Sequence, residues 1–463
     1  MSGIAMRKRI VTLVVLFFLF FGLATCTNTP NPNPTSNTPT QQDGKFRVWW
    51  QQGFYPEEAE AIRKLVADWE RKSGQKAELT LFSDKDIVRE TENAIATGQT
   101  PDLMFNPAVD LTLIPRLAWD NKLADVSDVI EPIKSFYTPE GLATVNYKNK
   151  SQNKRSYYAV PIGLQSSHIH YWRPMLKEAG SDEKVPEGWD SFWKYWETAQ
   201  DKLRAKGQKD IYGLGLPMSR AANDTFYIFG QFLEAYEVQL LDAQGQLQLD
   251  KPEVKQGITE ALKKYTSFYQ SKHVPPEAID WNNADNNVTF LSRSTVMTIN
   301  PSLSIPGSQR QDQQTYQTDM ATIEWPNKPN DKPMTYLAGI KQIVIFENSV
   351  HKKEAKDLLA YLVQPENLAA FLKDSQGRFF PIMPKLLEDP FWANAKDPHI
   401  SSAVRQYRFW RPYQQALNPA YTEVQAQNIW GSAILDVVKN GLSVEQATDK
   451  AIAKIKTIFS EWT

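Results

Sequence analysis

Hydrophobic and polar positions in residues 46–105 follow two alternating patterns. Short apolar runs are typical of buried strands, and apolar residues three or four positions apart, as at Ile62, Leu65 and Trp69, are typical of an amphipathic helix. The patterns predict the order strand, helix, strand, helix, strand, and this order predicts a parallel sheet with right-handed crossovers. Ligands bind beyond the carboxyl ends of the strands in such sheets. The predicted bounds are 46–50, 56–73, 77–82, 86–97 and 102–105.

A second series of strands and helices begins near residue 158, and helices dominate after residue 350. The length agrees with this division, because 463 residues at about 150 per domain make two or three domains. The absence of a repeat with a period of about 20–50 residues argues against a solenoid. The predicted strands are 158–161, 168–172, 211–216, 295–299 and 340–346, and the predicted helices are 174–179, 189–206, 254–272, 353–363, 365–373, 419–439 and 444–460.

The first 24 residues contain a short positively charged segment followed by an apolar stretch. Basic residues 7–9 precede the uncharged segment 10–24. The segment is shorter than the about 20 residues that a helix needs to cross a bilayer, so it predicts a secretory signal. Met6 stands directly before the charges and is an alternative start to Met1.

The single cysteine of the chain lies where the apolar stretch ends. The residues Leu23-Ala24-Thr25-Cys26 resemble a bacterial lipobox, although Thr25 stands where a smaller residue is usual. We therefore expect a signal peptide at 1–25, and a lipidated Cys26 that opens a flexible tether, 26–43. The tether has no large apolar side chain that could offset the entropy of ordering it. The alternative is an ordinary secretory signal in which Cys26 is incidental.

Charge and motifs exclude several classes of function. The chain has 52 Lys and Arg against 53 Asp and Glu, which gives no positive field for nucleic acid. One cysteine excludes an intramolecular disulfide. We find no P-loop, dinucleotide fingerprint, G-x-S-x-G elbow or H-E-x-x-H motif. His168 and His170 share one face of a predicted strand, which leaves a metal carrier open as a minor reading. Paired carboxylates for glycoside hydrolysis also stay open.

Eight short motifs follow one another over about 400 residues, and they are 97–104, 157–163 with 169–180, 185–192, 290–301, 323–326, 336–339, 378–381 and 441–447. Their order resembles the solute-binding proteins of ABC sugar importers, the family that includes maltose-binding protein. The sequence departs from the family pattern at Gly188, where threonine is usual, and at Ala338, which replaces one of two glycines.

The resemblance implies an α/β fold: a two-lobe periplasmic-binding-protein clamp, each lobe a doubly wound sheet flanked by helices, with a helical C-terminal section. It places the chain crossings near Ile162, Ile323 and Pro365, so that the cleft between the lobes closes by hinge motion. The expected N-lobe is 44–162 plus 324–364, and the expected C-lobe is 163–323 plus 365–463.

The resemblance also implies a function without catalysis and without a cofactor. The protein would be an extracytoplasmic, lipid-anchored monomer that captures a sugar and delivers it to the membrane permease subunits of an ABC importer. The ligand would be a disaccharide, a short oligosaccharide or a glycosyl-polyol. The alternative is an extracytoplasmic carbohydrate-active enzyme, a hydrolase or a lyase.

Sugar rings present a C–H face that suits aromatic side chains and a rim of hydroxyls that suits amides, carboxylates and guanidinium groups. Candidates therefore lie after predicted strands, in a polar stretch at 280–287, and at positions that match ligand loops of the family. Trp430 lies on a predicted amphipathic helix, where core packing is the alternative. The candidate ligand-binding residues are Trp50, Gln51, Gln52, Tyr55, Asn106, Asp110, Gln165, Ser166, Trp281, Asp285, Asn300, Trp325, Tyr336, Gly339, Arg378, Trp410 and Trp430.

One position of the family pattern predicts a different ligand contact. Maltose-binding protein has Asn-Gly-Pro-Trp after the strand that matches 295–299, and its tryptophan stacks on sugar. This chain has Asn300-Pro301-Ser302-Leu303. The stacking ring is absent, so the ligand or the stacking geometry differs.

Overall fold

The computed structural model describes residues 44–393 and 396–462. The expected signal peptide, Cys26 and the tether to residue 43 lie outside the described residues. Within the described part, no helix is long and apolar enough to cross a membrane.

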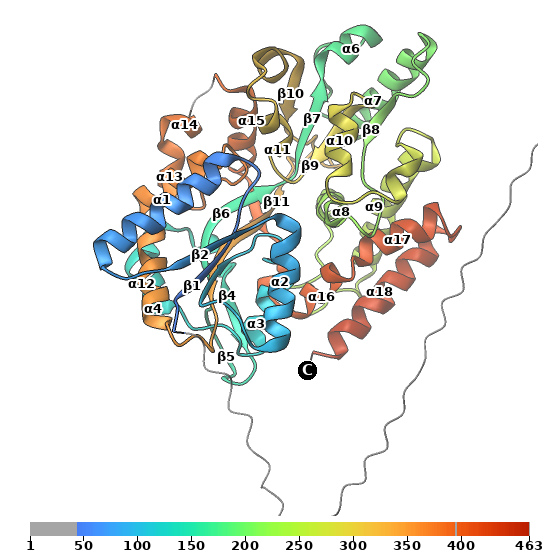
Figure 1. The fold of residues 1–463 in the computed structure, drawn as a ribbon. Coiled ribbons are helices and arrows are strands. Elements are labelled where there is room, and N and C mark those ends of the chain that lie inside the picture. The colour runs from blue at the N-terminus through green and yellow to red at the C-terminus, as the bar shows by residue number, and fades with distance from the viewer. Residues whose placement is uncertain (1–43, 394–395, 463) are drawn as a thin grey trace, which may run out of the picture. The chain divides into compact units, whose positions relative to one another are not determined.

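The first sheet contains the β-α-β-α-β series that the sequence predicts (Figure 1). Its strands are β1 (Arg47–Gln51), β2 (Glu78–Phe82), β3 (Leu103–Phe105), β6 (Val160–Ser166), β11 (Tyr336–Ile345) and β12 (Trp410–Pro412). β1 pairs in parallel with β2 and β3, which confirms the prediction. β11 runs antiparallel to β3 and β6 and parallel to β12.

Local sequence explains the first helices. α1 (Pro56–Ser73) buries its predicted apolar stripe, including Trp69, and ends at Gly74, whose φ of 74° is left-handed. α2 (Asp84–Thr97) begins two residues before the predicted start, because the Ser83 hydroxyl accepts a backbone N–H of its first turn. The later helices that pack with α1 are α12 (Lys352–Leu362) and α13 (Pro365–Asp374).

The second sheet has the order β10-β7-β9-β8. β8 and β9 are parallel, and β7 is antiparallel to both β9 and β10. The strands are β7 (His168–Trp172), β8 (Tyr212–Gly215), β9 (Thr295–Asn300) and β10 (Met320–Ile323). Helices that share one hydrophobic core with this second sheet are α6 (Arg173–Ala179), α7 (Trp189–Ala205), α8 (Asn223–Ala235), α9 (Pro252–Gln270), α10 (Asp285–Leu291), α16 (Ala420–Ala426), α17 (Ile429–Val438) and α18 (Val444–Ser460).

Short elements complete the described chain. They are α3 (Ile114–Trp119), α4 (Ser127–Ile130), α5 (Pro139–Ala143), α11 (Ser304–Ser308), α14 (Pro390–Ala393), α15 (Pro398–Gln406), the hairpin β4 (Asn146–Asn149) and β5 (Lys154–Tyr157), a π-helical turn at Gln314–Asp319, and 3₁₀ turns at Glu131–Phe136, Pro276–Ile279, Pro384–Glu388 and Gln414–Ala416.

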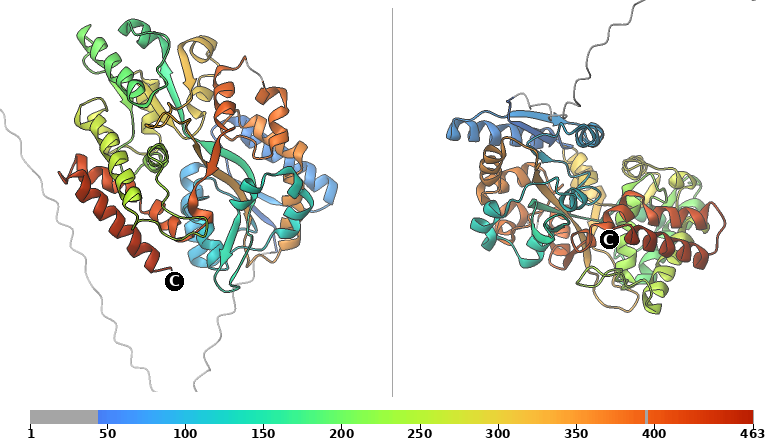
Figure 2. Two further views of the ribbon diagram at one scale, coloured as in Figure 1. Left: turned by 180° about the vertical axis from the view of Figure 1, so that it is seen from behind. Right: turned by 90° about the horizontal axis from the view of Figure 1, so that it is seen from below.

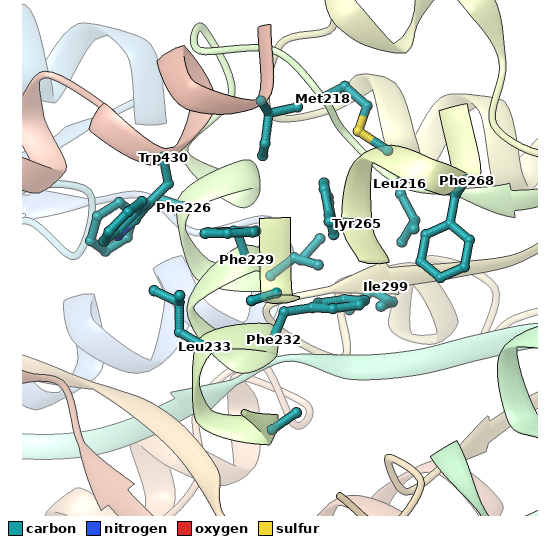
Figure 3. Close-up of a cluster of buried hydrophobic side chains, with 14 of the residues drawn as sticks. Leu216, Met218, Phe226, Phe229, Phe232, Leu233, Tyr265, Phe268, Ile299 and Trp430 are labelled. Atoms are coloured by element: carbon teal, nitrogen blue, oxygen red, sulfur yellow. The ribbon is translucent and has the colours of Figure 1, made fainter. Parts of the chain in front are cut away.

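α8 lies at the centre of the second core (Figure 3). Phe229 and Phe232 of this helix contact Tyr265 of α9 at ring-centroid distances of 5.6 and 4.9 Å, and Phe229 lies 5.6 Å from Trp430 of α17. No helix was predicted at 223–235, because α8 is buried on nearly every side and therefore shows no apolar stripe.

Two hydrophobic cores divide the described chain into two lobes. The first core draws mainly on residues 46–164 and 338–407, and the second on 169–337 and 413–458. Figure 2 shows the same division, because the orange α12 and α13 lie with the blue α1, while the red α17 and α18 lie with the green and yellow helices. We call the parts built on these cores the first and second lobes.

Within the described residues the chain crosses between the two cores three times, and the second and third crossings lie later in the chain than the sequence predicts. The first crossing falls between 164 and 169, close to Ile162. The second falls within β11, after Ile323. The third was expected near Pro365, but α13 packs on α1 in the first core, so the chain crosses only between Tyr407 and Tyr413. We propose these crossings as the lobe boundaries.

Four further local differences separate the structure from the predicted elements. The helix predicted at 419–439 is broken at Asn428, which has a φ of 42° and caps α17 through its side chain. The segment 336–339, which precedes the strand predicted at 340–346, belongs to β11 because β6 and β12 both pair with it. Trp410, expected in a helical section, lies in β12, and α10 begins inside the polar stretch 280–287, where no helix was predicted.

Candidate ligand-binding site

A cavity of about 820 Å³ lies between loops and helix ends of the two lobes. The first lobe contributes the segment after β1, the start of α2, the loop after β3 and the pair Arg378 and Phe379. The second lobe contributes the starts of α8 and α10 and the segment after β9, from Asn300 to Gln311. The volume falls within the range of about 300–1,000 Å³ that is typical of small-ligand sites.

The structure brings only part of the predicted set to this cavity. The predicted residues that line it are Gln51, Tyr55, Gln165, Asn300 and Arg378. Each comes from a segment that follows or ends a strand, except Arg378, which follows α13.

The other predicted residues lie elsewhere. Trp50 is buried in the first core, 4.5 Å from Phe105 and 5.5 Å from Phe371 between ring centroids. Trp281 and Trp430 are buried in the second core, and Asn106, Asp110, Ser166 and Gly339 are buried outside the lining. Trp325 and Tyr336 line a smaller cavity of about 470 Å³. Gln52, Asp285 and Trp410 are at least partly exposed and do not line the larger cavity.

The cavity also contains residues that the sequence analysis missed. Asp84 follows the carboxyl end of β2, so the strand-end rule could have found it. Phe54 lies in the loop after β1, beside two predicted residues. The start of α8 gave no such signal, because that helix was not predicted, and Asn287 lies in the polar stretch 280–287, from which only Trp281 and Asp285 were predicted. The missed lining residues that matter below are Phe54, Asp84, Asn223, Asp224, Tyr227, Asn287, Arg310 and Lys341.

Arg378 organises the wall of the first lobe. Its Nη1 lies 2.6 Å from Glu58 Oε2, and its Nη2 donates to Gln51 Oε1. Its guanidinium group lies 4.3 Å from the ring centroid of Phe54 and 4.6 Å from that of Phe379. Phe54 is 56% exposed, so one ring in this wall is available to a ligand.

A second buried ion pair supports the same wall. Lys341 Nζ lies 3.6 Å from Asp110 Oδ2 and donates to the carbonyl of Pro107 at 3.2 Å. Burial raises the pKa of Asp110 and lowers the pKa of Lys341, while each partner opposes the shift of the other. Only the lysine lines the cavity.

Asp224 occupies the first turn of α8 in the wall of the second lobe. It accepts a hydrogen bond from Asn286 Nδ2 at 3.3 Å. Burial raises the pKa of Asp224 to about 7, and the nearby carboxylate of Asp84 contributes to the rise. Asn300 donates to Ser302 and Ser304 and fixes the loop after β9.

The two walls touch at one side of the cavity. Arg310 Nη2 of the second lobe lies 2.5 Å from Glu57 Oε1 of the first. The same guanidinium group lies 4.5 Å from the ring centroid of Tyr55, whose hydroxyl donates to the carbonyl of Ser304 at 3.4 Å. These contacts join the lobes without filling the cavity.

The two histidines of β7 lie in structural surroundings: His168 packs against the rings of Phe380 and Tyr407, and His170 is hydrogen bonded. His170 Nδ1 lies 2.9 Å from Thr322 Oγ1, which lies 2.6 Å from His399 Nδ1. Burial lowers the pKa of His168 and His170 and favours neutral rings. In the described part of the chain, no group of three or more His, Cys, Asp or Glu residues could hold a metal ion.

A family model for bacterial extracellular solute-binding proteins matches residues 64–401. The chain belongs to this family of bacterial extracellular solute-binding proteins. Solved structures share its two-lobe fold. A solute-binding protein of an ABC transporter from Thermotoga lettingae, solved with α-D-tagatose, has a TM-score of 0.72 at 21% identity, over 89% of this chain and 99% of that chain. Maltose-bound MalE3 of T. maritima has a TM-score of 0.70 at 18% identity, over 89% and 99% of the two chains.

A binding protein of Brucella abortus (strain 2308) is 23% identical over 359 residues, which cover 73% of this chain and 80% of that protein. At these identities the structural matches establish the fold alone, a two-lobe α/β clamp. Function in a family of this kind depends on the side chains of the site.

Proposed function

We propose that this solute-binding protein captures a carbohydrate in the cavity between its lobes and delivers it to the membrane subunits of an ABC importer. The observation that carries the proposal is the lining of the 820 Å³ cavity. Amides, carboxylates and hydroxyls from both lobes surround it, together with the exposed ring of Phe54. This combination suits sugar hydroxyls and the C–H face of a sugar ring.

The ligand we propose is a disaccharide, a short oligosaccharide or a glycosyl-polyol. Two of the similar structures contain tagatose and maltose, which supports a carbohydrate without naming one. In this reading Phe54 takes the part of the stacking ring that is absent at Leu303, whose side chain is buried in the first core. Gln51, Gln165, Asn300 and Arg378 bind hydroxyls.

The proposal also covers location. We propose that the protein works outside the cytoplasm as a monomer, anchored by a lipid on Cys26, and the description of its family as extracellular supports the location. The acylated N-terminal peptide would be found by mass spectrometry of the membrane fraction. An unmodified N-terminus beginning elsewhere would contradict the anchor.

Isothermal titration of the purified protein against a panel of mono- and disaccharides and polyols tests the binding function. Ala108→Trp places a ring in the cavity lining and should abolish saturable binding. Ala453→Trp, at an exposed position of α18, is the matched control and should bind as the wild type does. Equal loss in both variants, or no binding to any panel member, would contradict the proposal.

A second candidate, a carbohydrate-active hydrolase or lyase, rests on one observation. Asp84 and Asp224 line the same cavity, and a pKa of about 7 suits Asp224 for general acid catalysis. Product analysis of the titration mixtures separates the two candidates. Sugar recovered unchanged supports a binding protein, and released product supports the enzyme.

A further inference from the structure

The three cations that line the cavity are each paired with a carboxylate of the protein. Arg378 Nη1 lies 2.6 Å from Glu58, Arg310 Nη2 lies 2.5 Å from Glu57, and Lys341 Nζ lies 3.6 Å from Asp110. These cations are therefore already neutralised before a ligand arrives.

Two carboxylates in the lining have no such partner. Neither Asp84 nor Asp224 forms an ion pair within 4 Å among the described residues, and each accepts a hydrogen bond from an amide side chain. Asp84 lies in the first turn of α2 in the first lobe, and Asp224 lies in the first turn of α8 in the second. The two excess negative charges thus belong to opposite walls of one cavity.

Around Asp224, the described residues add hydrogen-bond acceptors but no ion-pair partner. Asn286 uses its amide nitrogen for Asp224 and for the carbonyl of Ile299. Its Oδ1, and the Oδ1 of the lining residue Asn287, are buried without a hydrogen-bond partner in the part of the chain that the structure describes. A ligand at this wall must bring hydrogen-bond donors, since unpaired buried acceptors are costly.

Burial makes the charge of Asp224 costly as well. Asp224 is only 7% exposed, and burial raises its pKa to about 7. The start of α8 carries a partial positive charge that favours an anion, but this support does not offset the burial. A ligand cation between Asp84 and Asp224 would compensate the charge of both carboxylates, whereas a sugar hydroxyl would donate a hydrogen bond and leave the charge in place.

We propose that the natural ligand carries a protonated amino group, as an amino sugar or a short amino-sugar oligomer does, and that Asp84 and Asp224 bind this ammonium group from the two lobes. The proposal rests on the proposed function and names its ligand class. An ammonium group donates three hydrogen bonds, which suits Asp224 together with the free acceptor of Asn287, which also lines the cavity.

Matched pairs of sugars test the proposal, because the two members of each pair differ only by one ammonium group per sugar unit in place of a hydroxyl. Isothermal titration compares glucosamine with glucose, galactosamine with galactose, mannosamine with mannose, and the β-1,4-linked glucosamine dimer with cellobiose, at a pH that protonates the amines. We expect at least one amino sugar to bind tenfold or more tightly than its partner. Asp224→Asn and Asp84→Asn should each reduce that preference toward parity.

Asp190→Asn is the matched control, because Asp190 is an exposed acid at the start of α7 and lies outside the cavity. It should leave the preference unchanged, and thermal melts should show that all three variants fold. If each amino sugar binds as tightly as its neutral counterpart, the proposed ammonium site is wrong and carbohydrate binding stands. The same conclusion follows if Asp224→Asn weakens the binding of both sugars of a pair equally. Absence of binding across the whole panel overturns the proposed function itself.

Discussion

Arg378→Met should lower the free energy of unfolding by about 3–5 kcal/mol, because it removes the cation from a buried ion pair. The two side chains of the pair, Arg378 and Glu58, are 4% and 3% exposed. Methionine resembles the apolar stem of arginine but lacks the guanidinium group, so the contacts of that group with the rings of Phe54 and Phe379 are lost. Most of the cost arises from the carboxylate that stays buried without a cation.

This carboxylate has few other partners. Glu58 Oε1 has no hydrogen-bond partner among the described residues. Burial already raises the pKa of Glu58, and the charge of Arg378 opposes the rise. Without Arg378, the folded carboxyl group holds its proton more tightly than the unfolded one. The variant should therefore lose stability as the pH rises above the ordinary carboxyl value of 4.5.

Urea denaturation of the wild type, Arg378→Met and the double variant Glu58→Met/Arg378→Met at pH 5 and pH 8 measures these effects. The double variant should recover at least about 2 kcal/mol of the loss at pH 8, because it removes the buried charge. Arg310→Met is the control, since its partner Glu57 is 43% exposed and such pairs contribute about 0–1 kcal/mol. A double variant as unstable as the single one, at both pH values, would refute the reasoning.

Three further predictions concern the cavity walls and the anchor. The carboxyl group of Asp224 has a folded pKa of about 7 against 3.8 for an ordinary aspartate, so it should lower the stability of the ligand-free protein as pH rises from 4 to 7, by at most about 1.4 kcal/mol per pH unit. Asp224→Asn should flatten thermal stability over that window, and an unchanged slope would contradict the shift. Glu57→Gln breaks the contact with Arg310 and should increase the radius of gyration of the ligand-free protein in small-angle scattering; an identical profile would show that the contact does not hold the lobes. Cys26→Ser should move the protein from the membrane fraction to the soluble fraction, whereas continued membrane association would exclude lipid attachment at this residue.

The elements that could be predicted from the sequence are those with one buried face. α1 has a regular apolar stripe and the predicted bounds. α8 has no stripe because it is buried all round, so its pattern could not be told from other apolar runs. Missing α8 also meant missing Asp224, since its position depends on where that helix begins.

The site residues show the same limit. Alternation along β1 places Trp49 and Trp50 on opposite faces, but both faces of a parallel sheet are covered, so the pattern cannot say which ring meets a ligand. In the structure α13 covers Trp50 through Phe371, and the ring that reaches the cavity is Phe54 in the loop beyond. The strand-end rule located the loop, whereas long-range packing decided which side chain is free.

The structure of the protein with its carbohydrate bound would test the central claim most directly. The account predicts the sugar in the 820 Å³ cavity, in contact with Gln51 and Arg378 of the first lobe and Asp224 of the second. A sugar seated instead in the 470 Å³ cavity beside Trp325 and Tyr336, or held by one lobe alone, would contradict it.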